Sequence, residues 1–569
     1  MSAPAVAARV PAPVPLSAVA RRLEAASLLV ETAADASGVA SAAARPPTAR
    51  GAASAERATS NAASPTDPTL TGVSDDSRTT RQGDLFCAWT GTTADGHAYV
   101  GAAARAGAAA AVVERRVDAV LPQLVVRDGR RAAAIGADVV YGEPSRALRL
   151  VGVTGTNGKT TTVWILRHLL GARWPAASIG TLGAILEDGS VLPGSENLTT
   201  PGPVQLARTL RLFVDRGVQA LAMETSSHAL HQGRIHALRF DAAVFTNLSR
   251  DHLDYHGTLE AYLAAKVTLL DLLREDGCAV VNADDAAWTD VAARARRRLR
   301  FGRAGDADVR ASDVELGADG ATFVLSYTRR AVQVTLPLLA DFNVSNALGA
   351  AAAVLALGYG LDEVAALLAT VPQVPGRLER IADTPCPVLR DYAHTPDALE
   401  RALRSLRPLT SGRLIVVFGA GGDRDRGKRP LMGAAAEANA DVAIVTSDNP
   451  RTEDPDAIID EIVAGMDVAR VVREPDRRRA IARALEIANA EDVVLLAGKG
   501  HETYQVVGTA TRPFDERLIV RDLLSGAAGP LGEARGAGDE SGGAGRGVSD
   551  GPGASDPWND APRRPESSR

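Results

Sequence analysis

The feature that most constrains the fold of this chain is a loop rich in glycine and threonine, which lies between a short apolar run and an apolar helical segment. The run ends at residues 151–153, helical periodicity begins at Val163, and the loop reads Thr154-Gly155-Thr156-Asn157-Gly158-Lys159-Thr160-Thr161-Thr162. Such a loop presents backbone N–H groups and the positive end of a helix to phosphate, while Lys159 can reach the outer phosphates and Thr160 can ligate Mg²⁺. The usual pattern GxxxxGK[ST] begins with glycine, but this chain has Val153 there, so the loop is a variant. We predict an ATP site; the plainer interpretation is a Gly/Thr turn with an incidental lysine.

The 569 residues exceed what one hydrophobic core organises, and β-rich runs alternate with alanine-rich helical stretches along the chain. This alternation predicts an α/β fold with largely parallel sheets. The β-rich runs include residues 148–153, 242–247, 413–418, 442–446 and 493–497. Composition and turn-prone Pro/Gly positions predict three units, at 13–149, 150–372 and 373–525. The Ala/Ser/Thr/Pro-rich stretch at about 33–69 and the polar tail at 526–569 are expected to be disordered.

Charge, cysteine content and the length of the apolar runs bear on the partners and the compartment of this chain. Lys plus Arg number 63 against 69 Asp plus Glu, so no overall field would attract the chain to nucleic acid. The three cysteines, Cys87, Cys278 and Cys386, form no CxxC pair, which is typical of a reducing compartment. No apolar run is long enough to cross a bilayer. We predict a cytoplasmic protein without a membrane span or a nucleic-acid partner, and we expect a monomer.

A second group of polar residues follows two further apolar runs. Glu224 ends the first run, and His252 lies in the polar segment after the second; Lys266 comes later, in a helical stretch. Because strand ends meet at one edge of a parallel sheet, Glu224 and His252 could complete a Mg²⁺ site with Thr160. Neither H-E-x-x-H nor a Cys/His spacing occurs, which argues against zinc. The alternative for each residue alone is a structural side chain or a helix cap.

Five segments in order along the chain resemble the serial motifs of the Mur ligases. They are residues 154–162, 224–230, 246–257, 391–399 and 498–505, and the resemblance spans roughly residues 72–520. It implies three domains: an N-terminal UDP-substrate-binding domain, a central P-loop ATPase domain with a parallel sheet, and a C-terminal Rossmann-like domain that binds an amino acid. The implied activity is ATP-dependent addition of meso-2,6-diaminopimelate to the D-glutamate of UDP-N-acetylmuramoyl-L-alanyl-D-glutamate, through an acyl phosphate, in peptidoglycan synthesis.

The resemblance also implies roles for individual residues. Lys159, Glu224, His252 and Lys266 would be catalytic, with Lys266 carbamylated to N6-carboxylysine so that it ligates a second Mg²⁺; otherwise Lys266 is a solvated helix lysine. Residues 156–162 would bind ATP together with Asn346, Arg377 and Asp391. Asp341 stands where many relatives have glycine, which affects the shape of the local loop. Asp75, Ser77, Thr92, Thr93 and Ala94 would hold the uridine diphosphate end of the acceptor, and Thr199, Thr200, Ser226, Gln232 and Arg234 the rest.

The most discriminating motif is Asp448-Asn449-Pro450-Arg451, which resembles the signature of the diaminopimelate-adding members. Diaminopimelate differs from lysine by a carboxylate on its distal carbon, and a fixed guanidinium offers that group two parallel hydrogen bonds. Arg451 would supply them and would reject the ammonium-bearing lysine. Arg424, Gly498 and Glu502 would complete the pocket. The alternative is a plain Asp-Asn-Pro turn.

Two other functions compete with this interpretation. One is the same ligase chemistry with L-lysine, D-alanyl-D-alanine or a folate-linked glutamate, against which the Asp448-to-Arg451 motif argues. The other is a P-loop regulatory protein without ligase chemistry, against which the joint presence of Glu224, His252 and Lys266 argues.

Overall fold

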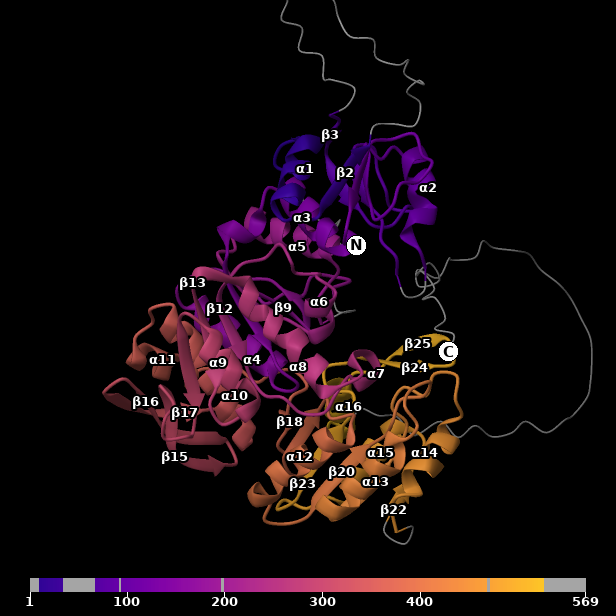
Figure 1. Ribbon diagram of the computed structural model, residues 1–569. Helices are drawn as coiled ribbons and strands as arrows, with labels where there is room; N and C mark the ends of the chain where they lie inside the picture. Colours follow the sequence, from indigo (N-terminus) through magenta and orange to yellow (C-terminus); the bar gives the residue numbers. More distant parts are fainter. Residues whose placement is uncertain (1–9, 34–66, 92–93, 196–198, 468–470, 527–569) are drawn as a thin grey trace, which may run out of the picture. The chain divides into compact units, whose positions relative to one another are not determined.

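The computed structural model describes residues 10–33, 67–91, 94–195, 199–467 and 471–526 (Figure 1). The predicted insertion, except at its two ends, and the predicted tail beyond residue 526 lie outside these residues. The described elements form three larger sheets, of five, ten and six strands in chain order, and two short two-stranded pairs. Every helix of this part of the chain is too short or too polar to cross a membrane.

The N-terminal sheet has the order β2-β7-β6-β5-β4 and is parallel from β4 to β7. Its strands and those beside it are β1 (Val14–Pro15), β2 (Leu29–Ala33), β3 (Thr69–Leu70), β4 (Gly72–Ser74), β5 (Asp84–Cys87), β6 (Ala110–Val113) and β7 (Gln123–Val126). The accompanying helices are α1 (Leu16–Ala25), α2 (Val100–Arg105) and α3 (Gly129–Val140). The loops after β4 and β5 leave the same sheet edge, because the two strands are parallel neighbours.

The ten-stranded sheet has the order β10-β9-β11-β8-β12-β13-β14-β15-β16-β17. Its strands are β8 (Arg149–Thr154), β9 (Ala176–Gly180), β10 (Gly183–Ile185), β11 (Ala220–Glu224), β12 (Phe240–Phe245), β13 (Leu273–Asn282), β14 (Arg298–Gly302), β15 (Val309–Gly317), β16 (Gly320–Tyr327) and β17 (Arg330–Leu336). Its helices are α4 (Lys159–Gly171), α5 (Pro203–Asp215), α6 (Ser227–His231), α7 (Leu253–His256), α8 (Leu259–Val267), α9 (Thr289–Arg294), α10 (Asp341–Ala356) and α11 (Leu361–Leu368). α10 is apolar on nearly all sides and packs beside α4 and α11 against strands β12 to β15, so it is a buried helix.

The register of three parallel strands brings the predicted polar motifs to one edge of this sheet. Glu224 at the end of β11 pairs with Val153 of β8, and Phe245 at the end of β12 pairs with Thr154. The segments that follow these strands therefore begin side by side. This confirms the expectation, drawn from the apolar runs, that these motifs meet at one sheet edge.

The C-terminal sheet has the order β18-β19-β23-β20-β21-β22, and all its pairs except β18–β19 are parallel. Its strands and the separate hairpin β24–β25 are β18 (Glu379–Ala382), β19 (Val388–Asp391), β20 (Leu414–Phe418), β21 (Val442–Val445), β22 (Val471–Arg473), β23 (Val493–Ala497), β24 (Tyr504–Val507) and β25 (Ala510–Pro513). The helices, several of which lie alongside the strands in Figure 1, are α12 (Pro396–Leu406), α13 (Lys428–Asn439), α14 (Pro455–Val463), α15 (Arg477–Ile487) and α16 (Glu516–Leu524). The predicted α/β class with largely parallel sheets is confirmed.

The backbone of the loop before α10 is strained at Ala340, which precedes Asp341. Ala340 has a positive φ, at +73° with ψ 146°, whereas Asp341 is the first residue of α10 and pairs with Arg303 at 3.3 Å. This backbone region strongly favours glycine. The position that calls for glycine on conformational grounds is therefore Ala340, whereas the backbone of Asp341 is helical.

We expect Ala340→Gly to raise the free energy of unfolding by up to about 1 kcal/mol, because the strain removed exceeds the backbone entropy that glycine adds to the unfolded chain. Ala347→Gly, in the regular interior of α10 and equally buried, is the matched control and should lower the free energy of unfolding by about 1 kcal/mol. Urea denaturation measures both. Equal destabilisation by the two substitutions would show that Ala340 is not strained.

Asp138 in α3 is a buried carboxyl that should make stability depend on pH. It is 5% exposed and accepts a hydrogen bond from Ser145 Oγ at 3.5 Å. Burial, reinforced by Glu143, raises the pKa of Asp138 to about 7. At higher pH the folded protein must keep an ionised carboxylate out of water, which is unfavourable.

We therefore expect Asp138→Asn to be more stable than wild type above about pH 7, by roughly 3–4 kcal/mol. Because the folded pKa lies above the unfolded value of 3.8, protonation favours folding, and the difference should grow from about pH 4 to about pH 7. Below that range both proteins carry a neutral side chain and the difference should vanish. Denaturation across this pH range tests the prediction, and a difference independent of pH would contradict it.

Candidate functional site

The phosphate loop is held in shape by the segment that follows β12. Thr156 N donates to Asn247 O at 2.7 Å, Asn157 N donates to Asn247 Oδ1 at 3.0 Å, and Thr246 Oγ1 donates to Asn157 O at 2.7 Å. Gly158, with φ +83°, leads into α4, so the loop N–H groups and the helix start face the same space. The loop is thus preformed as an anion-binding turn.

A cavity of about 360 Å³ lies against this loop and is lined by most of the residues predicted to bind ATP. Lys159 reaches back over the loop, where its Nζ donates to Gly155 O at 3.0 Å and to Thr156 O at 2.7 Å. The predicted residues in the lining are Thr156, Asn157, Gly158, Lys159, Thr160, Thr161, Thr199, Glu224, Ser226, His252, Lys266, Arg377 and Asp391. Thr162 is fully buried behind the loop, in α4.

Three more predicted ATP residues join the loop from distant parts of the chain. Arg377 Nη2 donates to Thr160 Oγ1 at 3.2 Å. A methyl group built on Gly158 would lie 2.2 Å from Asn346 Oδ1, so the amide of Asn346 lies directly against the loop. Asp391 accepts hydrogen bonds from Leu378 N and Ala393 N, and burial raises its pKa. The structure thus brings all three to the phosphate loop or its cavity.

Lys266 is buried beside the loop and is not a solvated helix lysine. It is 1% exposed, its Nζ donates to Gly155 O at 2.7 Å, and it lies 4.2 Å from the centre of the Tyr262 ring. Burial, followed by the positive charge of Lys159, lowers the pKa of Lys266 well below its ordinary value. Among the described residues it has no ion-pair partner. Its amine is therefore held in the state that can act as a nucleophile.

Glu224 and His252 face the same cavity and fit a Mg²⁺ site shared with nucleotide phosphates. Glu224 is 1% exposed and accepts from Thr181 N at 2.8 Å and from Thr181 Oγ1 at 3.2 Å. His252 has a φ of +52° and faces His228 with ring centroids 4.8 Å apart; burial lowers its pKa, which favours the neutral, ligating imidazole. Within the described chain no group of three His, Cys, Asp or Glu side chains could hold a metal by itself. A hard cation with phosphate oxygens as further ligands suits this sparse donor set.

Four of the residues predicted to hold the acceptor form one hydrogen-bonded group. Thr200 Oγ1 contacts Ser226 Oγ at 3.2 Å, Arg234 Nη1 donates to Thr200 O at 2.9 Å, and Arg234 Nε donates to Gln232 Oε1 at 2.9 Å. Thr199 contacts Thr181, the partner of Glu224, at 3.3 Å. The group therefore begins next to the candidate metal ligand.

The candidates for the uridine end lie on the N-terminal sheet, outside the lining of the phosphate-loop cavity. Asp75 and Ser77 follow β4, and Ala94 lies in the loop after β5. Thr92 and Thr93 lie outside the described residues. That loop is anchored by Glu114, whose carboxylate accepts from Thr90 N and Gly129 N at 2.9 Å each.

The predicted amino-acid pocket lies at the carboxyl edge of the C-terminal sheet. Asn449 Nδ2 donates to Glu502 Oε2 at 2.9 Å, and a methyl group on Gly498 would lie 2.6 Å from Asp448 Oδ2. That oxygen of Asp448 is buried and lacks a hydrogen-bond partner in the described chain. A buried, unpartnered carboxylate oxygen near Glu502 suits an ammonium ligand.

Arg424 and Arg451 converge on the same part of this pocket. A methyl group on Gly421 would lie 3.0 Å from Arg451 Nη1 and 3.6 Å from Arg424 Cγ. Burial and the charge of Arg424 lower the pKa of Arg451. Neither arginine forms an ion pair with any described residue. Two neighbouring arginines without a carboxylate partner in the described chain suit a carboxylate ligand.

Sequence reasoning did not identify several residues that the site uses. Thr181, which holds Glu224, follows β9 as a polar residue after a strand, and that position was its only signal. Lys499 lies in a motif that was recognised, yet its buried contacts with Asn449 and Glu502, at 3.2 Å each, were not expected. Tyr255 lies in the recognised segment 246–257, yet its 3.0 Å bond to Gln232 was not expected, and Glu114 carries no sequence signal.

A preformed phosphate loop that shares one cavity with a buried lysine and a carboxylate is typical of an enzyme that uses a nucleotide. Family profiles match in three consecutive ranges: the Mur ligase family catalytic domain at residues 69–153, the Mur ligase middle domain at 153–354, and the Mur ligase glutamate ligase domain at 376–500. The chain belongs to the Mur ligase family.

Curated relatives and solved structures agree with this assignment. The UDP-N-acetylmuramoyl-L-alanyl-D-glutamate–2,6-diaminopimelate ligase of Geobacillus kaustophilus is 44% identical over 80% of this chain and 94% of its own length. The ligase of the same name from Xylella fastidiosa is 45% identical over 81% of this chain and 94% of its own length. A solved structure of a ligase of that name is 36% identical, with a TM-score of 0.61 over 80% of this chain and 95% of that one. The Thermotoga maritima MurF ligase in complex with ADP has the same fold, at 21% identity and a TM-score of 0.58 over 80% of this chain and 98% of that one.

Proposed function

We infer that this protein is an ATP-dependent ligase that adds meso-2,6-diaminopimelate to the D-glutamate of UDP-N-acetylmuramoyl-L-alanyl-D-glutamate in peptidoglycan synthesis. The observation that carries the choice of amino acid is the convergence of Arg424 and Arg451 over Gly421, with Asp448 and Glu502 in the same pocket. Paired guanidinium groups match the distal carboxylate, and the acidic residues match ammonium groups. The relatives at 44% and 45% identity are both named UDP-N-acetylmuramoyl-L-alanyl-D-glutamate–2,6-diaminopimelate ligase. Because ATP is the energy donor, we place the reaction in the cytoplasm, and we retain the expectation of a monomer.

The phosphate loop and its lysine would carry the first step. A carboxylate is a poor electrophile, so one oxygen of the D-glutamate carboxylate attacks the γ-phosphorus of ATP, and ADP leaves. Lys159 and the loop N–H groups stabilise the charge that develops on the transferred phosphoryl group. Mg²⁺, which Thr160, Glu224 and His252 would hold, supplies further charge neutralisation on the phosphate oxygens when bound. The product is an acyl phosphate.

The amino-acid pocket would carry the second step. Asp448 and Glu502 hold ammonium groups of diaminopimelate, and Arg451 fixes its distal carboxylate, so that a single amine faces the acyl phosphate. That amine attacks the acyl carbon, phosphate leaves, and the nitrogen loses a proton to give the amide. Most of the catalysis is positioning and charge stabilisation.

Lys266 would act after reaction with carbon dioxide. Its buried amine attacks the carbon of carbon dioxide and loses a proton, which gives a carbamate anion. An anion at this position suits the neighbouring Lys159 and would serve as a ligand for a second Mg²⁺. The pocket would thereby hold an anion beside the Lys159 ammonium.

The test is phosphate release from ATP in the presence of UDP-N-acetylmuramoyl-L-alanyl-D-glutamate and one amino acid at a time. We expect release with meso-diaminopimelate and at least about 100-fold slower release with L-lysine. Equal use of L-lysine would remove the specificity claim. Phosphate release that depends on neither the UDP-linked acceptor nor the amino acid would instead favour a nucleotide-dependent regulatory protein.

A further inference from the structure

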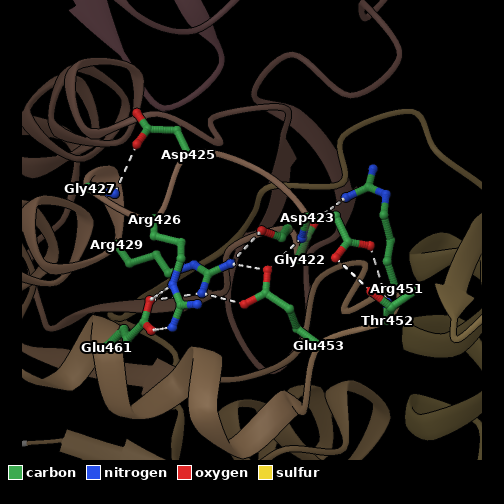
Figure 2. A network of polar contacts seen from close by, with 11 residues as sticks. Gly422, Asp423, Asp425, Arg426, Gly427, Arg429, Arg451, Thr452, Glu453 and Glu461 are labelled. Carbon is green, nitrogen blue, oxygen red and sulfur yellow. Dashed lines mark hydrogen bonds and ion pairs between the residues drawn. The ribbon is translucent and has the colours of Figure 1, made fainter. Parts of the chain in front are cut away.

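The segment that carries Arg451 faces a second loop, residues 421–425, which we call the facing loop. Figure 2 shows how the two segments are joined by polar contacts. Arg451 Nη1 donates to Gly422 O at 2.7 Å, and Thr452 Oγ1 donates to Asp423 Oδ1 at 2.7 Å. Asp423 and Arg451 both have positive φ, at +52° and +53°. Two non-glycine residues in this conformation require support from their surroundings.

That support comes from a buried arginine behind the facing loop. The side chain of Arg429, at the start of α13, is fully buried, and its guanidinium forms two hydrogen bonds of 2.8 Å with the two carboxylate oxygens of Glu453. It also donates to Gly421 O at 3.3 Å. Glu453 accepts from Asp423 N at 2.6 Å. Glu453 therefore connects the buried cation to the loop that Arg451 touches.

The remaining partner of Arg429 lies on the side away from the loop. Glu461 in α14 accepts from Arg429 Nη1 at 2.8 Å and also pairs with Arg426. It forms no hydrogen bond or ion pair with residues 421–425 or with Arg451 in the described chain. Arg429 lowers the pKa of Glu453 to about 2, so Glu453 is ionised throughout the pH range of an enzyme assay.

The opposite side of Arg451 is fixed by the hairpin β24–β25. Arg451 N donates to Val506 O at 3.1 Å, Gly508 N donates to Arg451 O at 2.6 Å, and Val506 N donates to Asn449 Oδ1 at 3.0 Å. The backbone of Arg451 is thus held by the hairpin, whereas its guanidinium is aimed by the facing loop. The facing loop in turn depends on Glu453 and Arg429.

We propose that Glu453 and Arg429 are positioning residues that set the preference for diaminopimelate by aiming Arg451 and Arg424 at the distal carboxylate. This inference rests on the proposed function. A guanidinium held in place before binding loses little side-chain freedom when it accepts the carboxylate, and two fixed guanidinium groups leave an ammonium of lysine unmatched. Without Glu453, the facing loop keeps only the 3.3 Å hydrogen bond from Arg429 to Gly421 O as its link to the buried cation, and the substrate must order Arg451 as it binds.

The test compares Glu453→Gln with Glu461→Gln, a matched pair because both side chains are partly exposed and both bond Arg429. Glutamine at position 453 keeps the volume of the side chain. Its NH₂ group, however, is a donor that would face the N–H donors of Arg429 or Asp423, so at least one of these hydrogen bonds is lost. We expect Glu453→Gln to raise KM for diaminopimelate about tenfold or more and to reduce the preference over L-lysine by a similar factor, with kcat and the KM for ATP within about twofold of wild type. Glu461→Gln should behave as wild type.

Three outcomes separate the possibilities. If wild type shows no diaminopimelate-dependent phosphate release, the proposed function is wrong and the inference falls with it. If wild type is active and Glu453→Gln keeps its KM for diaminopimelate, the positioning role is wrong although the function stands. If Glu453→Gln loses kcat, affinity for ATP and melting temperature together, Glu453 serves only the fold, and the positioning role is again overturned.

Discussion

Replacing Arg451 with alanine is expected to lower kcat/KM for meso-diaminopimelate by roughly 10²–10³-fold. Loss of one partner from a largely desolvated charge pair costs about 2–5 kcal/mol, and much of that cost falls on the substrate carboxylate, which remains buried without its partner. Phosphate release at varied diaminopimelate concentration measures the effect. The KM for ATP should change little, because Arg451 lies outside the lining of the phosphate-loop cavity.

Two further substitutions make this prediction specific. Arg451→Lys keeps the charge but not the planar pair of donors, so we expect it to recover only a small part of the activity. Arg404→Ala, at an exposed arginine of α12 whose one ion pair with a described residue is to Glu400 in its own helix, controls for loss of positive charge and should be neutral. Full activity of Arg451→Ala with diaminopimelate would show that Arg451 does not bind the distal carboxylate.

Replacing Lys266 with alanine is expected to lower kcat by roughly 10³-fold, with the KM for diaminopimelate nearly unchanged. A group that stabilises charge only in the transition state acts on kcat, and loss of one such group costs about 10²–10³-fold or more. The structure supports this role because the amine is 1% exposed and lies at the phosphate loop, 2.7 Å from Gly155 O. Single-turnover phosphate transfer isolates the affected step.

Carbamylation of Lys266 gives this prediction a chemical signature. Wild-type activity should fall in buffer depleted of carbon dioxide and return on addition of bicarbonate. Lys266→Ala should not respond to bicarbonate but should recover partly with a small carboxylic acid, which can occupy the vacated space as an anion. A Lys266→Ala variant that is fully active, or a wild type indifferent to carbon dioxide, would contradict the carbamate.

Local sequence patterns predicted the elements that carry the chemistry. The strand predicted at 493–497 has those bounds in β23, and the strand before the phosphate loop was predicted to within one residue at each end of β8. The Gly/Thr loop, the apolar run before Glu224 and the run before Asp448 each identified a strand end with polar residues after it. Such patterns are readable because strand burial and loop chemistry depend on residues that are close in sequence.

Backbone strain and the long-range contacts that hold the site residues in place could not be predicted from local sequence patterns. The strained backbone of Ala340 was not foreseen, because a sequence motif does not report a dihedral angle. Thr181 and Glu224 are 43 residues apart, and the two residues joined by the Glu453–Asp423 contact are 30 apart. These partners carry no pattern of their own, because any polar side chain near a strand end meets the same local criteria.

The sequence by itself therefore determined the α/β class, several of the strands and the family to which the chain belongs, and it predicted where phosphate and an amino acid would bind. Only the tertiary structure decided which side chains share each pocket, because the order of strands in a sheet places residues together that are far apart along the chain. Lys266 and Gly155, 111 residues apart, meet because the segments after β8 and β12 leave the same sheet edge. Burial at that edge lowers the pKa of this helix lysine well below its ordinary value and so favours the neutral amine beside the phosphate loop.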